Sequence, residues 1–422
     1  MITRQAALAL DAADSLRSLR QLFSIPPGVL YLDGNSLGVL PLATAARVQQ
    51  LVQQEWGVGL IRSWNTAGWI SLPQRVGNKI AQLVGAGADE LVVADSTSVN
   101  LYKVLSAAAH IVAADATQSQ RRIILSDRSN FPTDLYIAQA LAAERGFELQ
   151  LAEDHELPGL LAGTLKDRCA LLMLTHVNYR NGRMHNMAAL SSAAHAAGAL
   201  VIWDLAHSAG AVPLHLHRDG ADFAVGCGYK YLNGGPGAPA FVWVHPRHAD
   251  RFWQPLAGWM GHAAPFEFTP EYRPAAGITR YLCGTPPLLS LAALECGVDT
   301  VLAAQALGGM AALRTKSLAL TRLFAQQVQA LCPQLTLLSP VDDALRGSQV
   351  SFSHPVMAYA VVQALIARGV IGDFRAPDVL RFGFTPLYLG YADTWDAAEH
   401  LHQVLASGEW QQPQFLQRHA VT

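Results

Sequence analysis

The sequence predicts an α/β protein in which a large domain carries a mainly parallel sheet and a smaller α+β domain follows. Two observations support this class. Short apolar runs alternate with amphipathic stretches from about residue 70, and strands that are apolar on both faces are typical of a parallel sheet covered by helices. The 422 residues are also sufficient for two domains.

The predicted elements of the large domain alternate between strand and helix. Four apolar runs are predicted to be buried strands, at residues 121–127, 169–177, 198–206 and 221–229. Amphipathic helices are predicted at residues 132–146 and 187–198. Because parallel neighbours need a crossover connection, which is usually a helix, this order favours a parallel sheet.

The last third of the chain has a different pattern. A long helical region is predicted from Pro287 to about Leu331, and the remainder reads strand, helix, strand and helix. We therefore predict three segments: residues 1–60 pack with the small domain, residues 61–310 form the large domain, and residues 311–422 form the small α+β domain.

Charge and hydropathy argue against two classes of partner. The net charge is −2 and Lys and Arg do not cluster, so we expect no nucleic acid partner. Glu295 and Asp299 interrupt the long Ala/Leu stretch after Pro287, so we expect no membrane span. The first twenty residues turn acidic and helical after a short apolar patch, which is not the pattern of a signal peptide.

Five scattered cysteines without a C-x-x-C pair indicate a reducing, cytoplasmic environment and no structural metal site. Alternation in the stretch Leu214–His217 would place His215 and His217 on the same side of a strand. A third ligand is absent from the neighbouring sequence, so we predict no metal site there.

Polar residues at the ends of predicted parallel strands are the first candidates for a site, because ligands bind at the carboxyl ends of such strands. Three ends qualify: Thr175, Asp204 and Lys230. Asp204 and Lys230 are 26 residues apart, about one strand–connection–strand unit, so both can face one crevice.

An aspartate and a lysine placed in this way suit pyridoxal 5′-phosphate. This cofactor needs an amine for a Schiff base and a carboxylate that keeps its ring nitrogen protonated. Thr97 and Ser98 are predicted at a helix N-terminus, where free N–H groups attract a phosphate dianion. The glycines that follow Lys230 allow the backbone to pass close to the cofactor.

Seven stretches, in this order over nearly the whole chain, resemble the kynureninase family. They are Tyr31–Pro41, Asp95–Lys103, Asn130–Tyr136, Trp203–Pro213, Gly228–Gly237, Cys283–Pro287 and Asp378–Tyr388. The resemblance implies a pyridoxal-phosphate enzyme of fold type I, in the aminotransferase superfamily, with a mainly parallel sheet of the seven-stranded type. It also implies a homodimer whose sites are shared between subunits, and the bacterial branch of the family.

The resemblance assigns expected roles to the cofactor residues. Lys230 would form the Schiff base, Asp204 would pair with the pyridinium nitrogen, and His207 would support the cofactor. The remaining cofactor contacts are expected from Phe131, which would stack on the ring, Asp134 beside it, Thr97, Ser98 and Tyr229 at the phosphate, Thr175, and, from the partner subunit, Trp259 and Thr285.

The same resemblance assigns the substrate residues. Arg381 would bind the α-carboxylate as a bidentate fork, with Ser36 beside it. Trp64 and Gly284 fit a pocket that favours L-kynurenine over 3-hydroxykynurenine. Tyr229 would act as a proton donor, although a simple hydrogen bond to the phosphate explains it equally well.

Taken one at a time, many of these residues have ordinary explanations. Phe131 and Trp259 suit a core, Trp64 suits loop packing, and Ser36 suits a turn. Asp134 and His207 suit helix ends, Thr175 suits a strand end, and Arg381 suits a surface charge. The occurrence of all these residues in the order seen in the family favours functional roles for them.

The implied reaction is hydrolytic cleavage of L-kynurenine to anthranilate and L-alanine, a step of tryptophan catabolism that also feeds NAD biosynthesis. The nearest alternative is a class-V aminotransferase or a cysteine desulfurase, but a desulfurase needs a mobile loop cysteine and Cys332 looks like core. A second alternative is a non-catalytic, metabolite-binding regulator, against which the intact set of Asp204, Lys230 and Arg381 argues. A nicotinamide-dependent dehydrogenase would need a glycine fingerprint after its first strand, which the sequence lacks.

Overall fold

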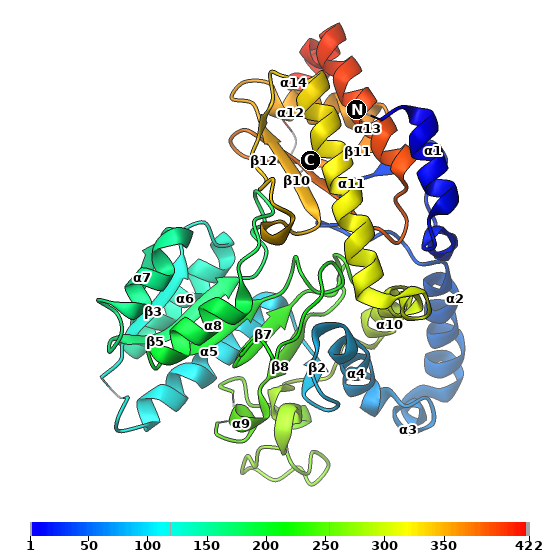
Figure 1. Ribbon diagram of the computed structural model, residues 1–422. Helices are drawn as coiled ribbons and strands as arrows, with labels where there is room; N and C mark the ends of the chain where they lie inside the picture. Colours follow the sequence, from blue (N-terminus) through cyan, green and yellow to red (C-terminus); the bar gives the residue numbers. More distant parts are fainter. Residues whose placement is uncertain (1, 119, 253, 419–422) are drawn as a thin grey trace.

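The computed structural model describes residues 2–118, 120–252 and 254–418 (Figure 1). Its centre is a seven-stranded sheet with the order β2-β8-β7-β6-β5-β3-β4. The strands are β2 (Leu91–Val93), β3 (Ile123–Asp127), β4 (Glu148–Ala152), β5 (Cys169–Thr175), β6 (Leu200–Asp204), β7 (Phe223–Gly226) and β8 (Phe241–Val244). β8 is antiparallel to both neighbours and the other pairs are parallel, which confirms the predicted fold class.

Helices cover both faces of this sheet, and alternate residues of the strands explain why the strands are apolar throughout. Leu172 and Trp203 belong to the core on one face, whereas Leu171 and Ile202 belong to the core on the other. The helices are α4 (Leu72–Val84), α5 (Thr97–Ala114), α6 (Pro132–Arg145), α7 (Leu157–Ala162), α8 (Met187–Ala196) and the short α9 (Pro246–Ala249). The predicted helices at 132–146 and 187–198 are α6 and α8, and the four predicted strands are β3, β5, β6 and β7.

The long helical region predicted after Pro287 is broken once. α10 (Leu288–Leu302) ends in a short 3-10 turn, Gly308 turns the chain at a φ of 99°, and α11 (Gly309–Leu331) rises from the large domain into the upper lobe (Figure 1). A φ in the left-handed region costs a glycine little, so Gly308 allows two helices to meet here at an angle.

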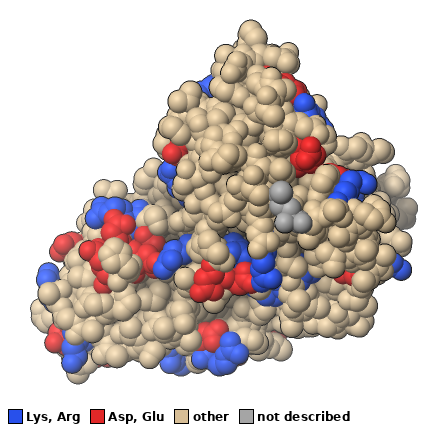
Figure 2. Space-filling model, turned by 45° about the horizontal axis from the view of Figure 1, so that its top comes forward, with Lys and Arg blue, Asp and Glu red and all other residues tan. Residues whose placement is uncertain are grey.

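The upper lobe is built on a four-stranded antiparallel sheet with the order β12-β13-β10-β9. Its elements are β9 (Thr336–Leu337), β10 (Gln349–Ser353), α12 (Ala358–Ala367), β12 (Asp373–Arg375), β13 (Val379–Gly383), α13 (Tyr391–Ser407) and α14 (Pro413–Leu416). Figure 2 shows Lys, Arg, Asp and Glu side chains gathered in a band where this lobe meets the large domain.

The N-terminal segment lies along this lobe before it runs down to the large domain (Figure 1). α1 (Arg4–Ala13) packs on α13, and β1 (Leu30–Tyr31) pairs in parallel with β11 (Val370–Ile371). α2 (Leu42–Gln50) then packs on α10, followed by the π-helical Leu51–Gly59 and by α3 (Ser63–Thr66). The division at residues 60 and 310 stays a prediction.

The α10 region bears on the expectation that no segment spans a membrane. The stretch Leu288–Leu307 is long and apolar enough, by length and composition, to be a candidate membrane span. Its two acidic residues are ion-paired on the surface of α4, Glu295 with Arg75 at 2.9 Å and Asp299 with Lys79 at 2.8 Å. Because its apolar side chains are buried between α2 and α4, we interpret it as a core helix.

The alternating stretch Leu214–His217 does not form a strand. This stretch is an irregular connection and turn in which both leucines are buried and both histidines are exposed. The alternation therefore arises because the two leucines attach a surface loop to the core. His217 contacts Glu90 at 2.6 Å.

Candidate active site

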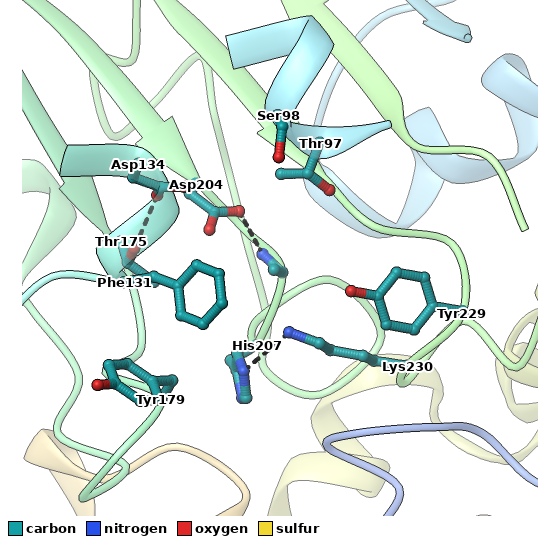
Figure 3. Close-up of a pocket in the computed structure, with 11 residues that line it drawn as sticks. Thr97, Ser98, Phe131, Asp134, Thr175, Tyr179, Asp204, His207, Tyr229 and Lys230 are labelled. Carbon is teal, nitrogen blue, oxygen red and sulfur yellow. Dashed lines mark hydrogen bonds between the residues drawn. The ribbon is translucent and has the colours of Figure 1, made fainter. Parts of the chain in front are cut away.

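Three strand ends of the large sheet meet at one cavity. Thr175 and Asp204 are the last residues of β5 and β6 and lie opposite each other in the register. Lys230 follows the end of β7 after a short turn. All three line a cavity with about 440 Å³ of empty space, part of which is open to solvent. Figure 3 shows Asp204 and Lys230 on opposite sides of this cavity.

The cavity brings together most of the predicted cofactor residues. Those lining it are Thr97, Ser98, Phe131, Asp134, Thr175, Asp204, His207, Tyr229 and Lys230, together with Ala206 and Tyr179, which the sequence analysis missed. Tyr179 follows the end of β5, so its place after a strand was the signal that could have identified it.

The acidic side of the cavity holds two buried carboxyl groups. Oδ1 of Asp204 accepts a hydrogen bond from the backbone N–H of Ala206 at 2.8 Å. Burial raises the pKa of Asp204, while the charge of Lys230 opposes the rise. Burial and then the neighbouring charge of Asp204 raise the pKa of Asp134 well above its usual range. A cationic ring nitrogen beside Asp204 would compensate the cost of burying this charge.

The basic side of the cavity holds Lys230 and His207. Nε2 of His207 lies 3.0 Å from Nζ of Lys230, and Nδ1 of His207 is buried without a partner among the described residues. Burial and then the charge of Lys230 lower the pKa of His207 well below its usual range, so the imidazole is neutral. Burial raises the pKa of Tyr229, so its phenol keeps its proton at neutral pH.

The third wall is the N-terminus of α5. The side chain of Ser96 caps the helix by accepting from the N–H of Val99 at 3.3 Å, and Thr97 and Ser98 form the first turn, as predicted. Asp95, just before this turn, has a left-handed backbone conformation with a φ of 48°, and its carboxylate ion-pairs with the buried Lys103. Free N–H groups and the helix dipole make this wall suitable for a phosphate.

A flat wall is provided by Phe131, which is 41% exposed. Its ring meets Tyr179 edge to face at 5.2 Å, and its backbone N–H donates to Oδ1 of Asn130 at 2.6 Å. Thr175 donates to the same amide oxygen and to Asp134 at 3.3 Å. A strand-end hydroxyl thus fixes the turn that presents the aromatic ring.

A second group of residues, which we call the arginine cluster, joins three segments of the chain. It consists of Ser36 in the loop before α2, Asp373 and Arg375 on β12, and Arg381 on β13. Arg381 is 2% exposed and donates to both oxygens of Asp373, with an Nε–Oδ1 distance of 2.7 Å. It also donates to Oγ of Ser36 at 2.8 Å and to the backbone oxygen of Tyr179 at 2.7 Å. Ser36 and Arg381 are among the residues predicted from the sequence, whereas Asp373 and Arg375 are not.

The loop that carries Ser36 also contacts the lysine segment. The N–H of Gly38 donates to the backbone oxygen of Tyr229 at 2.7 Å. A Cβ at Gly38 would lie 2.5 Å from the backbone oxygen of Lys230. Glycine is therefore required where the two segments cross.

Three predicted residues lie away from the cavity within one subunit. Trp64 packs edge to face on Trp69 at 6.1 Å, Trp259 packs on Phe266, and Thr285 is exposed. None of them belongs to the residues that line the cavity.

Among the described residues, Asp127, Asp154 and His185 form the group whose ligand atoms lie within 4.8 Å of one another. His185 contacts Asp154 at 2.9 Å through Nδ1, and both carboxyl groups have further donors. This network stabilises the loops at the end of β3.

The cavity fits pyridoxal 5′-phosphate on its own chemistry. It offers an amine, a buried carboxyl group that gains from a cation, a neutral imidazole with an unpartnered nitrogen, an exposed ring and a helix N-terminus. The model of the kynureninase C-terminal domain matches residues 313–401. The kynureninase of Pseudomonas fluorescens is 55% identical over 427 residues, covering all of both chains, and that of Burkholderia mallei is 54% identical over 426. A cysteine desulfurase from Thermococcus onnurineus shares the fold, with a TM-score of 0.77 and 18% identity, covering 92% of this chain and 98% of that one.

The fold, together with the full-length kynureninase relatives, defines a pyridoxal-phosphate-dependent enzyme of fold type I. Within this class the chain belongs to the kynureninase family, the hydrolases that act on a carbon–carbon bond. This confirms the predicted family and cofactor, and the desulfurase similarity concerns the fold alone.

Proposed function

We propose that this protein hydrolyses L-kynurenine to anthranilate and L-alanine by cleaving the bond between the β- and γ-carbons. The observation that carries the proposal is that Asp204 and Lys230 face one cavity in a chain with full-length similarity to kynureninases. When bound, pyridoxal 5′-phosphate supplies an electron sink that allows the substrate's α- and β-carbons to carry negative charge.

The proposed cofactor contacts follow the walls of the cavity. Lys230 would bind the cofactor covalently, and Asp204 would hold the ring nitrogen. His207 would support Lys230 through its Nε2, since the neutral imidazole can accept a hydrogen bond from the amine. The other proposed contacts are a ring contact at Phe131, phosphate contacts at Thr97, Ser98 and Tyr229, and polar contacts at Thr175 and Asp134.

Proton transfers would be carried by two neighbouring residues. Lys230 is placed to take the proton from the substrate's α-carbon. Tyr229 keeps its proton at neutral pH because burial raises its pKa, so it can donate that proton to the β-carbon when the bond breaks. Water supplies the hydroxyl group that completes the carboxylate of anthranilate.

The substrate's carboxylate would bind at the arginine cluster, with Arg381 as the main cation and Ser36 beside it. Trp64 and Gly284 would line the aryl pocket and favour L-kynurenine over 3-hydroxykynurenine. A ratio of kcat/KM values that favours the hydroxylated substrate would contradict the second point.

A homodimer with shared sites is also proposed, in the cytoplasm. Large apolar side chains are exposed along α2, the π-helix and the 3-10 turn Leu60–Arg62 that follows, including Leu42 at 57%, Trp56 at 57% and Ile61 at 77%. Such patches mark protein interfaces. The half-buried position of Trp259 and the exposed position of Thr285 leave both side chains accessible to a partner subunit.

The central experiment measures anthranilate fluorescence from L-kynurenine with purified protein. We expect product from the natural protein, and loss of both product and visible cofactor absorbance in Lys230→Ala. Lys166→Ala, which changes an exposed lysine, serves as the matched control and should retain both signals. Failure of the natural protein to form anthranilate would refute the proposal.

Shared sites can be tested by mixing subunits. Lys230→Ala and Trp259→Ala proteins should each have low activity, whereas a mixed dimer contains one site with both natural residues. We expect activity to return after the two are unfolded and refolded together. Sites contained within one subunit would show no such return.

A further inference from the structure

Two guanidinium groups in the arginine cluster share one carboxylate. Asp373 on β12 lies opposite Arg381 on β13 in the antiparallel register, and Arg375 follows two residues later on the same face of β12. Nη2 of Arg375 donates to Oδ2 of Asp373 at 2.6 Å, the same oxygen that accepts from Nη2 of Arg381. The pair of cations therefore has one bonded anion, and the nearby Asp33 is neutral below pH 7 because burial raises its pKa to about 7. One positive charge is then left to be matched.

Arg381 has little hydrogen-bonding capacity left. A guanidinium carries five N–H donors. Arg381 makes four hydrogen bonds, two to Asp373, one to Ser36 and one to the backbone oxygen of Tyr179, so one N–H remains. A carboxylate bound as a bidentate fork needs two donors.

Arg375 has the donors that Arg381 lacks. Its two hydrogen bonds both come from Nη2, to Asp373 at 2.6 Å and to Ser36 at 3.4 Å. Its Nε is buried without a partner, and Nη1 donates to no described residue. Its side chain is 41% exposed, against 2% for Arg381, so a ligand can reach it.

Arg375 also lies within electrostatic reach of the cavity. Its positive charge is one of the causes that lower the pKa of His207, after burial, Lys230 and Arg381, and it opposes the rise in the pKa of Tyr229. The cation on the small domain is thus near enough to act electrostatically on two residues that line the cavity.

We propose that Arg375 is a second binding residue for the substrate's α-carboxylate, which it holds together with Arg381. The inference rests on the proposed function, because the ligand is the amino-acid end of L-kynurenine. Arg381 supplies its one remaining N–H, and Arg375 supplies the Nη1 donors without first breaking a bond to the protein.

The experiment compares two ligands that differ only in the carboxylate. L-kynurenine and kynuramine, the amine left when its carboxylate is removed, are titrated into the holoenzyme, and binding is followed by the change in cofactor absorbance. The proteins are the natural one, Arg375→Met, Arg375→Lys and the control Arg368→Met. Arg368 is an ion-paired arginine of the same lobe, bonded to Glu409 at 2.8 Å.

Arg375→Met should weaken L-kynurenine binding and raise its KM about 10- to 100-fold, the range for a lost charge-assisted hydrogen bond. Kynuramine binding should stay unchanged, Arg375→Lys should recover part of the loss, and Arg368→Met should resemble the natural protein. An equal loss for both ligands would assign Arg375 a purely structural role and overturn the proposal, as would an unchanged affinity for L-kynurenine.

The two proposals fail in different ways. A natural protein that forms no anthranilate refutes the proposed function whatever Arg375 does. If the natural protein turns over L-kynurenine normally, and Arg375→Met binds L-kynurenine and kynuramine with the same relative affinities as the natural protein, only the role of Arg375 is refuted. If Arg375→Met does not fold, Arg375→Lys and Arg375→Gln give the same comparison.

Discussion

The cavity at the ends of β5, β6 and β7 and the arginine cluster would hold two neighbouring groups of the same substrate, its amine and its carboxylate, but they are built differently. The cavity takes most of its residues from successive strand ends, and among the described residues Nδ1 of His207 has no hydrogen-bond partner there. The arginine cluster takes residues from β12, β13 and the loop before α2, and Arg381 is almost completely hydrogen-bonded. Parallel-sheet topology creates the first arrangement, whereas contacts between distant segments create the second.

The largest effect is expected from removing Asp373, the carboxylate that both arginines of the cluster share. Asp373→Ala leaves the buried Arg381 without its charge partner, so the free energy of unfolding should fall by about 3–5 kcal/mol. Urea unfolding of the small domain measures this change. Glu267→Ala, which breaks the exposed Arg273 ion pair, should change stability by less than about 1 kcal/mol. Equal changes in the two variants would contradict the assigned difference in burial.

The corresponding change in the cavity affects chemistry more than folding. Asp204→Asn keeps the shape but removes the charge that would stabilise the ring nitrogen, so kcat should fall about 100- to 1,000-fold. Anthranilate fluorescence measures the rate, and cofactor absorbance shows whether the cofactor remains bound. A variant that keeps its kcat would show that Asp204 does not act on the ring.

An intermediate effect is expected where the two regions touch. Gly38→Ala places a Cβ against the backbone oxygen of Lys230. The backbone shift needed to avoid this clash should lower the free energy of unfolding by about 1–3 kcal/mol. Thermal unfolding measures the loss of stability. Gly28→Ala is not an equivalent control, because Gly28 has a left-handed φ of 77°. Gly159→Ala has open space and should be nearly neutral by comparison.

The smallest effect concerns pH and the charge of the arginine cluster. Burial, and then the charge of Asp373, raise the pKa of Asp33 to about 7, while Ser36, Arg381 and Arg375 oppose the rise. Below pH 7 Asp33 is neutral and the cluster keeps its positive charge. Above pH 7 Asp33 ionises, so KM for L-kynurenine should rise by up to about tenfold, and Asp33→Asn should remove this rise.

The same group gives a stability test whose sign is fixed. Because the pKa of Asp33 is higher in the folded protein than in the unfolded chain, its contribution to stability is fully present below the unfolded value of about 3.9 and is lost as pH rises through 7. Urea unfolding at pH 5 and pH 8 should therefore show a smaller decrease for Asp33→Asn than for the natural protein. An identical decrease would place the pKa of Asp33 near its ordinary value.

The sequence was sufficient for the parts that depend on local pattern. Apolar runs and their polar ends predicted β5, β6 and β7 together with Thr175, Asp204 and Lys230, and small hydroxyl residues predicted the start of α5. The alternation at His215 and His217 was misleading, because buried leucines produce the same pattern in a loop.

The arginine cluster could not be predicted in the same way. Asp373 and Arg375 lie on a three-residue strand that has no distinctive sequence pattern. Only the pairing with β13 and the approach of the Ser36 loop bring them into one hydrogen-bonded group with Arg381. Ser36 and Arg381 were named through family resemblance. Trp64, Trp259 and Thr285 do not line the cavity within one subunit, and the roles of Trp259 and Thr285 rest on the homodimer proposed above.

The loop from Ser36 to Gly38 connects the two regions mechanically. Ser36 is hydrogen-bonded to Arg381 in the upper lobe, and two residues later Gly38 is bonded to the backbone of Tyr229, next to Lys230. Any tilt of that lobe must therefore carry the lysine segment with it or break a hydrogen bond. Closure of the lobe on a substrate would then also reposition Lys230.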